Sequence, residues 1–348
     1  MAIRVGLNGF GRTGRAILRE AKRRKVPFNF TVINDVADPA LLAANLRFDS
    51  VHGAYPKSEV QIIQDDKGNQ VLKFGEDHIR VLGEKDNAKL PWKELPTDVV
   101  IDTTGAFSTR EKLEAHLQAG AKKIIVYPPP TGYEPDLSII MGVNDDQLTG
   151  KEKVISAGSC TTNAATPLAA ILEKEFGIET LYLLTVHAFT SDQRLLDFPH
   201  ADVRRSRAAN LSIIPTSTSA GKALEKILPE LKGKVFSSAH RVPIPDGSVV
   251  DLTFVTGKPA SVEAINQAVA KACAEARLQG ILEYSTDPIV SVDVIGNTNS
   301  AVFDAEFTQA VDDRFFKVSA WFDNELGYAN RVIDLLVKLD GLGKNVWA

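Results

Sequence analysis

Residues 3–14 read IRVGLNGFGRTG and place Gly9, Gly11 and Gly14 between a short apolar run and a basic helical pattern. This G-x-G-x-x-G spacing is typical of the strand-to-helix turn in a dinucleotide-binding β-α-β unit. The first glycine allows the tight turn, the second lets a pyrophosphate approach the backbone, and the third lets the helix pack on the strand. Asp35 follows about 20 residues later, where a carboxylate would bind ribose hydroxyls and repel a 2′-phosphate. The segment therefore predicts dinucleotide binding and favours NAD over NADP. The alternative is an ordinary glycine-rich turn followed by an acidic loop.

The rest of the first half alternates short β-branched runs with helical patterns. Strands are predicted at residues 3–7, 30–34, 99–102 and 123–126, with helices at 14–24, 40–46 and 110–119. Short antiparallel additions are predicted at 60–64, 71–74 and 78–82. Such alternation predicts an α/β fold with a Rossmann-type, doubly wound parallel sheet.

The second half carries longer strand-like runs. Strands are predicted at residues 180–188, 236–243, 249–255, 289–294, 301–304 and 315–321, with helices at 164–176, 220–231 and 262–279. This pattern indicates an α+β catalytic domain with a mixed or antiparallel sheet. We predict a nucleotide-binding domain over 1–158 and a catalytic domain over 159–323. The C-terminal helix, 324–348, is assigned to the first domain, although its pattern fits either.

Composition limits the class of protein further. A chain of 348 residues exceeds the usual single-domain size, and a net charge of −4 argues against nonspecific nucleic-acid binding. The two cysteines, Cys160 and Cys273, show no CxxC or metal-ligand spacing, which favours a reducing compartment and predicts no metal site. No secretory signal pattern occurs, and no apolar stretch approaches the roughly 18 residues of a membrane helix. These features predict a cytoplasmic protein.

Residues 159–163, Ser-Cys-Thr-Thr-Asn, place Cys160 where a helix is expected to begin. Unpaired N–H groups and the helix dipole favour a thiolate there, and the flanking hydroxyls can hold an anion. His187, at the end of a predicted strand, is the kind of residue that activates a cysteine. Taken alone, Cys160 could be a structural residue, and His187 could be an ordinary histidine at a strand end whose hydrogen bonds are made within the fold.

Arg241 lies in an apolar strand context, where a charge is costly unless it binds an anion. Hydroxyls in residues 213–222 precede a helix, which suits either a phosphate or a helix cap. The cluster Arg204, Arg205 and Arg207 could be an anion site or a solvated face.

Together these segments resemble phosphorylating glyceraldehyde-3-phosphate dehydrogenase along nearly the full length. The matching stretches are 8–12, 34–35, 49–53, 119–123, 141–144, 159–163, 185–193, 213–218, 241–243, 248–252 and 321–328. The resemblance implies a glycolytic oxidoreductase that uses NAD and inorganic phosphate to convert D-glyceraldehyde 3-phosphate to 1,3-bisphosphoglycerate through a thioester. It also implies a homotetramer in which a loop near 194–215 packs close to a neighbouring subunit's cofactor.

The resemblance also implies roles for single residues. Cys160 corresponds to the nucleophile and His187 to its base. The substrate's own phosphate would contact Thr190, Asp192 and Arg241. The attacking phosphate would contact Ser159, Thr161, Thr218, the altered position Ser219 and an arginine near 205, taken as Arg205, although the sequence does not separate it from Arg204 and Arg207. The cofactor would contact Gly9, Gly11, Arg12, Thr13, Gly14, Asp35, Thr104, Gly105, Tyr127, Asn324 and Tyr328.

Several positions depart from the family pattern. Ala164 replaces a second cysteine, Lys85 an arginine near the adenine, and Ser219 a glycine in the inorganic-phosphate loop. Residues 127–130, Tyr-Pro-Pro-Pro, replace Ser-Ala-Pro, and Asp246-Gly247 replaces Asn-Val. Ser219 is the change expected to affect the attacking anion most.

Three alternatives stay open. One is an erythrose-4-phosphate dehydrogenase, which hydrolyses its thioester, and another is a paralogue that accepts arsenate. The third, from a different class, is a noncatalytic scaffold or RNA-binding protein.

Overall fold

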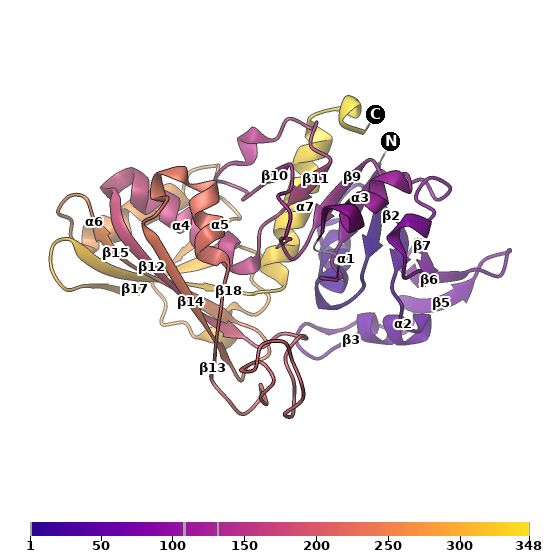
Figure 1. The fold of residues 1–348 in the computed structure, drawn as a ribbon, viewed down its shortest axis with the longest axis horizontal. Coiled ribbons are helices and arrows are strands. Elements are labelled where there is room, and N and C mark those ends of the chain that lie inside the picture. Colours follow the sequence, from indigo (N-terminus) through magenta and orange to yellow (C-terminus); the bar gives the residue numbers. More distant parts are fainter. Residues whose placement is uncertain (1, 107–108, 131, 348) are drawn as a thin grey trace. The chain divides into compact units, whose positions relative to one another are not determined.

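The computed structural model describes residues 2–106, 109–130 and 132–347 (Figure 1). The chain forms two compact units. The first unit contains residues up to Ile139, Asp146–Gly158 and the chain from Val332; the second contains Ile140–Asp145 and Ser159–Arg331. Each unit has its own sheet and is described by itself. The domain boundaries drawn from the sequence stay a prediction.

The first unit is built on a nine-stranded sheet. Its order is β10 (Leu137–Ser138), β11 (Val154–Ser156), β9 (Lys123–Val126), β8 (Val99–Asp102), β1 (Ile3–Asn8), β2 (Phe28–Asn34), β7 (Asp77–Leu82), β6 (Gln70–Phe74) and β5 (Val60–Gln64). Neighbours run parallel except at the pairs β5–β6 and β6–β7. The apolar runs of β8 and β9 are buried throughout, as expected for parallel strands covered on both faces. β7 differs from the predicted antiparallel addition because it also pairs in parallel with β2.

The first unit also contains the helices α1 (Arg12–Arg24), α2 (Pro39–Arg47) and α3 (Arg110–Gln118), and a short hairpin of β3 (Phe48–Asp49) and β4 (Gly53–Ala54). The part of the C-terminal helix from Val332 belongs to it as well. α1 begins directly after Gly11, two residues before the predicted start. A Cβ atom at Gly14 would lie 2.4 Å from the carbonyl oxygen of Gly9, so glycine permits the close packing of α1 on the turn. The third glycine of the motif is therefore needed for close packing of the helix, as the sequence predicted.

The second unit contains a seven-stranded mixed sheet. Its order is β13 (Ile214–Thr216), β14 (Val235–Val242), β12 (Ile178–Ala188), β15 (Ser248–Thr256), β18 (Phe315–Phe322), β17 (Ala301–Ala310) and β16 (Leu282–Ser285). The pairs β12–β14 and β16–β17 are parallel, and the other neighbours are antiparallel. Burial alternates along β15, which is typical of a sheet with one face in a core.

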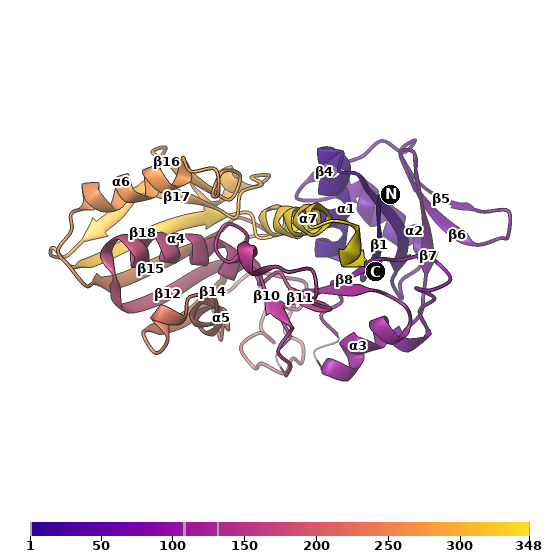
Figure 2. The same ribbon diagram turned by 90° about the horizontal axis from the view of Figure 1, so that it is seen from above.

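Helices α4 (Cys160–Phe176), α5 (Ala220–Ile227) and α6 (Val262–Cys273) pack on this sheet, and α4 and α6 lie side by side along it (Figure 2). Large side chains on the sheet stay exposed at Tyr182, Phe236 and Phe307. Tyr182 and Phe236 stack with their ring centroids 5.8 Å apart. The fold class, a Rossmann-type unit plus an α+β unit with a mixed sheet, is confirmed.

Several predicted elements of the second unit differ from the observed ones. The strand predicted at 289–294 is wrong: Ser291–Val294 forms a 3-10 helix, η4, in which the Asp293 carboxylate accepts a hydrogen bond from the Val290 N–H at 2.8 Å. Pro288, just before this segment, lacks an N–H for strand pairing. The helix predicted to end at residue 231 ends at Ile227, before Pro229, and the helix predicted to end at 279 ends at Cys273.

The C-terminal helix is shorter than predicted. α7 (Leu326–Gly341) is followed by a 3-10 turn, η5 (Lys344–Trp347), and residue 348 lies outside the described residues. Within the part of the chain that the structure describes, no helix has both the length and the apolar character needed to cross a membrane.

Candidate active site

The glycine turn of the first unit lies at the carboxyl end of β1. Gly9 has φ +89°, a left-handed conformation that favours glycine, and a Cβ atom there would lie 2.9 Å from the backbone nitrogen of Thr104. A Cβ atom at Gly11 would meet nothing within 4 Å, so its backbone is open to a ligand. Arg12 and Thr13 form the first turn of α1, which has no side-chain cap or acidic residue. An uncapped helix N-terminus suits a pyrophosphate.

Asp35 is held beside this turn. Its Oδ2 accepts a hydrogen bond from the Phe10 N–H at 2.8 Å, and its Oδ1 accepts one from the Ala37 N–H at 3.0 Å. Arg12, in contrast, donates to the Asp49 carboxylate at 2.9 Å. The carboxylate at the end of β2 and the open glycine backbone together fit a dinucleotide.

Thr104, Gly105 and Tyr127 follow the neighbouring strands β8 and β9. The Thr104 N–H and hydroxyl both donate to Oδ1 of Asp102, at 3.0 and 2.8 Å. The Tyr127 N–H donates to the Asp102 carbonyl at 2.8 Å. Gly105 has φ +65°. These residues therefore lie on the same sheet edge as the glycine turn, at the carboxyl ends of parallel strands.

In the second unit, Cys160 and His187 lie in contact. Cys160 is the first residue of α4, and its Sγ is 3.3 Å from Nε2 of His187 at the end of β12. The other ring nitrogen, Nδ1, lies 2.7 Å from the carbonyl oxygen of Ala188. A carbonyl can only accept, so Nδ1 carries the proton and Nε2 presents its lone pair to the thiol.

Burial, and then the positive charge of Arg241, lower the pKa of His187 to about 3. The side chain is only 4% exposed, and its ring packs edge-on against Phe322. The imidazole is therefore neutral at physiological pH. It becomes charged when it takes a proton from a group in contact with it, so an ion pair with Cys160 requires transfer of the thiol proton.

Arg241 lies beside His187 because both use the same carbonyl group. One of its Nη atoms donates to the Ala188 carbonyl at 3.2 Å and to the Thr190 hydroxyl at 2.8 Å. The Thr190 hydroxyl in turn donates to the Asp192 carboxylate. The predicted substrate-phosphate residues Thr190, Asp192 and Arg241 thus form one cluster next to the predicted base.

Arg205 joins the same cluster. Its Nη1 donates to Asp192 Oδ2 at 2.7 Å, and its Nε donates to the Thr216 hydroxyl at 2.8 Å. Burial alone would raise the pKa of Asp192, but the hydrogen bond from Thr190 and the charges of Arg205 and Arg241 lower it overall. The site therefore contains two guanidinium groups held by hydrogen bonds, and two carboxylates lie beside Arg205: Asp192 at 2.7 Å and Asp202 at 3.7 Å. Guanidinium N–H groups are donors of the kind that bind a phosphate.

The two other arginines of the cluster point elsewhere. Arg207 pairs with Asp197 at 3.0 Å, both largely exposed, and Arg204 is exposed. Of the three arginines that the sequence did not separate, Arg205 is the one that donates to Asp192 and Thr216 within the described part of the chain.

The remaining predicted anion residues are at two helix starts. The Ser159 hydroxyl caps α4 by accepting a hydrogen bond from the Thr162 N–H at 3.1 Å, and Thr161 is buried in the first turn. The Thr218 hydroxyl accepts from the Ala220 N–H at 3.2 Å at the start of α5. Ser219 is exposed with φ −91°, so its backbone does not require glycine. A side-chain cap is therefore present at the start of α4, whereas Ser219, the N-cap residue of α5, makes no side-chain cap hydrogen bond.

Asn324 follows β18, and Tyr328 is buried in the first turns of α7. The Asn324 side-chain oxygen accepts a hydrogen bond from the Ser248 hydroxyl at 2.7 Å, and its backbone N–H donates to Asp246 Oδ1 at 3.1 Å. The Ser248 hydroxyl also accepts from the Ala188 N–H at 3.1 Å. A continuous hydrogen-bonded path thus runs from Asn324 to the residue whose carbonyl group orients His187.

The sequence interpretation missed the residues that hold this arrangement. Ala188 acts through its backbone, for which a sequence carries no side-chain signal. Ser248 lies in a stretch that matched the family pattern, and Asp246 was noted only as a departure from it. Thr216 was part of the hydroxyl-rich segment 213–222 but was not assigned to Arg205.

A β-α-β unit with an open glycine turn, joined in one chain to a unit with a paired thiol and imidazole, defines a dinucleotide-dependent oxidoreductase. Residues 3–110 match the family model described as glyceraldehyde 3-phosphate dehydrogenase, NAD binding domain, and residues 159–324 match its C-terminal domain. The chain belongs to the glyceraldehyde-3-phosphate dehydrogenase family. The predicted resemblance, the enzyme class and NAD as the cofactor are confirmed.

Curated relatives are similar over almost the whole chain. The chain is 47% identical over 342 residues to glyceraldehyde-3-phosphate dehydrogenase of Mycolicibacterium smegmatis, which covers 97% of this chain and 98% of that protein. The enzyme of the same name from Geobacillus stearothermophilus is 45% identical over 344 residues, covering 99% of this chain and 100% of the relative.

Proposed function

We propose that this chain oxidises D-glyceraldehyde 3-phosphate with NAD and inorganic phosphate to 1,3-bisphosphoglycerate, through a thioester on Cys160. The observation that carries the proposal is the 3.3 Å contact between the Cys160 thiol and a neutral His187, with Arg241 and Arg205 fixed around the same group of residues. A nucleophile, a base and guanidinium groups that can bind a phosphate are the parts that a phosphorylated aldehyde needs.

The chain's own groups would act in order. His187 Nε2 takes the thiol proton, and the Cys160 thiolate adds to the aldehyde carbon. The backbone N–H of Cys160, in the first turn of α4, and the imidazolium N–H stabilise the resulting oxyanion. The imidazolium gives its proton to this oxyanion, which forms the hemithioacetal hydroxyl and leaves His187 neutral. His187 then takes that hydroxyl proton back as the carbon is oxidised to the thioester. Phosphate attacks the thioester carbonyl and releases the acyl phosphate, which regenerates the thiolate.

NAD, when bound, supplies the hydride acceptor for this oxidation. The residues proposed to hold it are those of the glycine turn with Asp35, and Thr104, Gly105, Tyr127, Asn324 and Tyr328. Asp35 supports the choice of NAD over NADP because its carboxylate, held by two backbone N–H groups, would repel a 2′-phosphate. Domains 1–158 and 159–323 are the proposed nucleotide-binding and catalytic parts.

Replacing Arg205 by alanine is expected to raise the KM for phosphate or for the phosphorylated aldehyde by about 10- to 100-fold, because a charge-assisted hydrogen bond is worth about 1.5–3 kcal/mol. Steady-state kinetics with each substrate varied would measure this. Arg207→Ala is the matched control, since that side chain is exposed and paired with Asp197, and it should stay within about twofold. Equal effects of the two variants would contradict the assignment of Arg205.

A panel of substrates and anions tests the proposed function. NADH formation is measured with glyceraldehyde 3-phosphate and erythrose 4-phosphate, with NAD and NADP, and with phosphate, arsenate or no added anion. The expected result is oxidation of the triose phosphate that depends on NAD and phosphate. A rate independent of added anion would favour the hydrolysing erythrose-4-phosphate dehydrogenase, and a preference for arsenate the arsenate-using paralogue. The absence of any thiol-dependent oxidation would favour a noncatalytic scaffold or RNA-binding role.

The assembly proposed is a cytoplasmic homotetramer. Apolar side chains are exposed along the arginine-bearing loop: Leu195, Leu196, Phe198, Val203, Leu211 and Ile213. Large apolar side chains exposed together in one segment support an interface, and the exposed rings of Tyr182 and Phe236 on the sheet support the same proposal. Sedimentation at micromolar concentration would contradict it if the protein ran as a monomer.

A further inference from the structure

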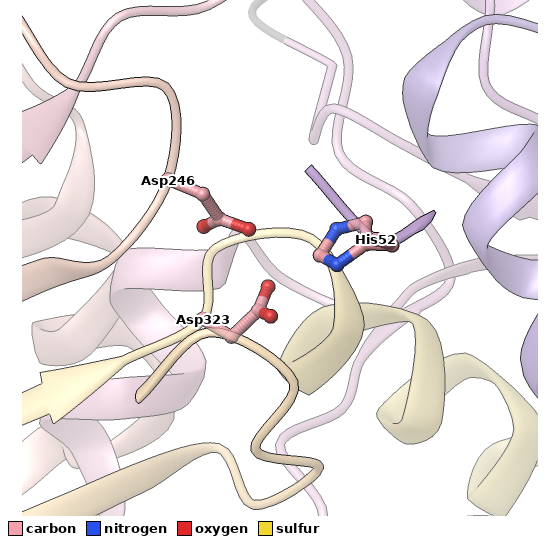
Figure 3. Close-up of side chains that lie close together, drawn as sticks. All are labelled: His52, Asp246 and Asp323. Carbon is pink, nitrogen blue, oxygen red and sulfur yellow. The ribbon is translucent and has the colours of Figure 1, made fainter. Parts of the chain in front are cut away.

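Two buried carboxyl groups face each other in the second unit. Asp246 lies in the loop between β14 and β15, and Asp323 directly follows β18. Each residue is 1% exposed, and a carboxyl oxygen of one lies within 4.8 Å of a carboxyl oxygen of the other (Figure 3). His52, also drawn in Figure 3, is a residue of the first unit, and the inference concerns the two carboxyl groups of the second unit.

The two carboxyl groups have unequal surroundings. Asp323 accepts hydrogen bonds at both oxygens, from the backbone N–H groups of Gly296, Glu325 and Leu326, at 2.8, 2.9 and 2.7 Å. Backbone donors of this kind stabilise the ionised form. Oδ1 of Asp246 accepts hydrogen bonds from the N–H groups of Gly247 and Asn324 at 2.8 and 3.1 Å. Two like charges at this separation in a buried site cannot both persist, so Asp246 is the group that takes a proton.

The electrostatics of the site also indicate that Asp246, and not Asp323, carries the proton. Burial, followed by the negative charges of Asp323 and Glu325 and a hydrogen bond with Asp323, raises the pKa of Asp246 to about 8. The Gly247 N–H acts in the opposite direction but is a smaller effect. Asp246 is therefore uncharged at neutral pH and can donate its proton to Asp323.

Both aspartates of the pair are connected to Asn324. Asn324 follows Asp323 in sequence, and its N–H donates to Asp246. Its side-chain oxygen is fixed separately by Ser248. A change in the distance between the two carboxyl groups therefore moves the backbone on which Asn324 stands. An uncharged aspartic acid at 246 offers the same donor and acceptor as the asparagine that the family pattern has there.

We propose that Asp246 and Asp323 share one proton at neutral pH, and that this shared proton positions Asn324 for the nicotinamide carboxamide. The cofactor contact of Asn324 rests on the proposed function. Loss of the proton to solvent at higher pH leaves two carboxylates in contact, which separates the loop and the strand end and weakens binding of NAD. Asp246 is thus a positioning residue that makes NAD affinity sensitive to alkaline pH.

The variant Asp246→Asn keeps the donor and both acceptor bonds but does not titrate, and its thermal unfolding can be compared with the wild type from pH 5 to 10. In the folded chain Asp246 keeps its proton up to about pH 8, whereas the unfolded chain loses it near 3.8. The unfolding equilibrium constant of the wild type therefore rises with pH between those two values, by up to about tenfold per pH unit relative to the variant. Above about pH 8 it rises no further relative to the variant. The difference in Tm should widen up to about pH 8 and then stay constant.

The matched control is Asp312→Asn, an exposed aspartate of the same unit. The backbone N–H groups of Arg314 and Phe315 lower the pKa of Asp312, so it is charged throughout pH 5–10. Its replacement should change Tm by an amount that does not depend on pH. An Asp246→Asn difference that is likewise constant would overturn the shared proton.

Calorimetric titration with NAD tests the positioning role without catalysis. The wild type should bind NAD about tenfold more weakly at pH 9.5 than at pH 6.5, and Asp246→Asn should bind equally at both. A pH-dependent Tm difference with equal NAD affinities would overturn the positioning role but keep the shared proton. A wild type that binds no NAD at either pH would contradict both the cofactor contacts of the proposed function and the positioning role of Asp246. The Tm comparison would still test the shared proton in that case.

Discussion

Replacing Cys160 by alanine should lower phosphate-dependent NADH formation by a factor of about 10⁴ or more, the range seen when a covalent nucleophile is removed. The thiol is the group that bonds to the aldehyde carbon in the proposed mechanism, and no hydroxyl beside it has a comparable nucleophilicity near neutral pH. Initial rates at saturating substrate measure the loss. Helix α4 should remain intact, because alanine is well tolerated in a first helical turn. The far-ultraviolet circular dichroism and Tm should therefore change little.

Cys273 provides the matched control for this prediction. It ends α6, and burial followed by the negative charge of Glu283 raises the pKa of its thiol to about 11. A thiol of this kind stays protonated and unreactive near neutral pH. Cys273→Ala should keep the wild-type rate and take up one equivalent of iodoacetamide, whereas Cys160→Ala should take up almost none. Retention of phosphate-dependent activity in Cys160→Ala would remove the thioester from the mechanism.

The sequence predicted those parts of the fold that depend on local patterns. The glycine turn was placed correctly because Gly9 and Gly14 have steric reasons that a local motif carries, such as the 2.4 Å approach that a side chain at Gly14 would make. The strands β8 and β9 were found because each carries three apolar β-branched residues in a row, which is typical of buried parallel strands. Segment 289–294 was wrong because its apolar residues resemble a strand while Asp293 closes a turn on Val290, a contact that periodicity does not reveal.

The site shows a similar division. Side chains with strong chemical signals, such as Cys160 and Arg241, were selected from the sequence as candidates for function. The groups that orient them were not, because the Ala188 carbonyl is a backbone atom and Ser248 acts across strands far apart in sequence. The neutrality of His187 was also not predictable, since it follows from burial and from the charge of Arg241 in the folded chain. The sequence pattern thus identified the candidate residues. Their orientation, and the protonation of His187, followed only from the tertiary structure.

Replacing His187 by asparagine should lower the rate by about 10²–10⁴-fold near pH 7, the usual contribution of a positioned base. Asparagine can still donate a hydrogen bond to the Ala188 carbonyl, but it has no nitrogen lone pair that can take the Cys160 proton. The variant thiol must then ionise on its own, so both its rate and its alkylation by iodoacetamide should rise as pH approaches about 8.5, the ordinary thiol value. His78→Asn, an exposed histidine of the first unit, is the control and should leave both profiles unchanged.

Acid stability provides a second measurement on the same variant, with the opposite pH direction from Asp246. The pKa of His187 is lowered from 6.5 to about 3 in the folded chain. Between pH 6.5 and 3 the imidazole is therefore protonated in the unfolded chain but stays neutral in the folded chain. The wild type therefore has this stability in full above pH 6.5 and loses it as the pH falls toward 3, whereas His187→Asn lacks this dependence. Denaturant unfolding at pH 7 and pH 4.5 should show a smaller loss for the variant than for the wild type. Equal losses would mean that the pKa of His187 is the same in the folded and unfolded chain, and would contradict the lowering of this pKa by burial and by Arg241.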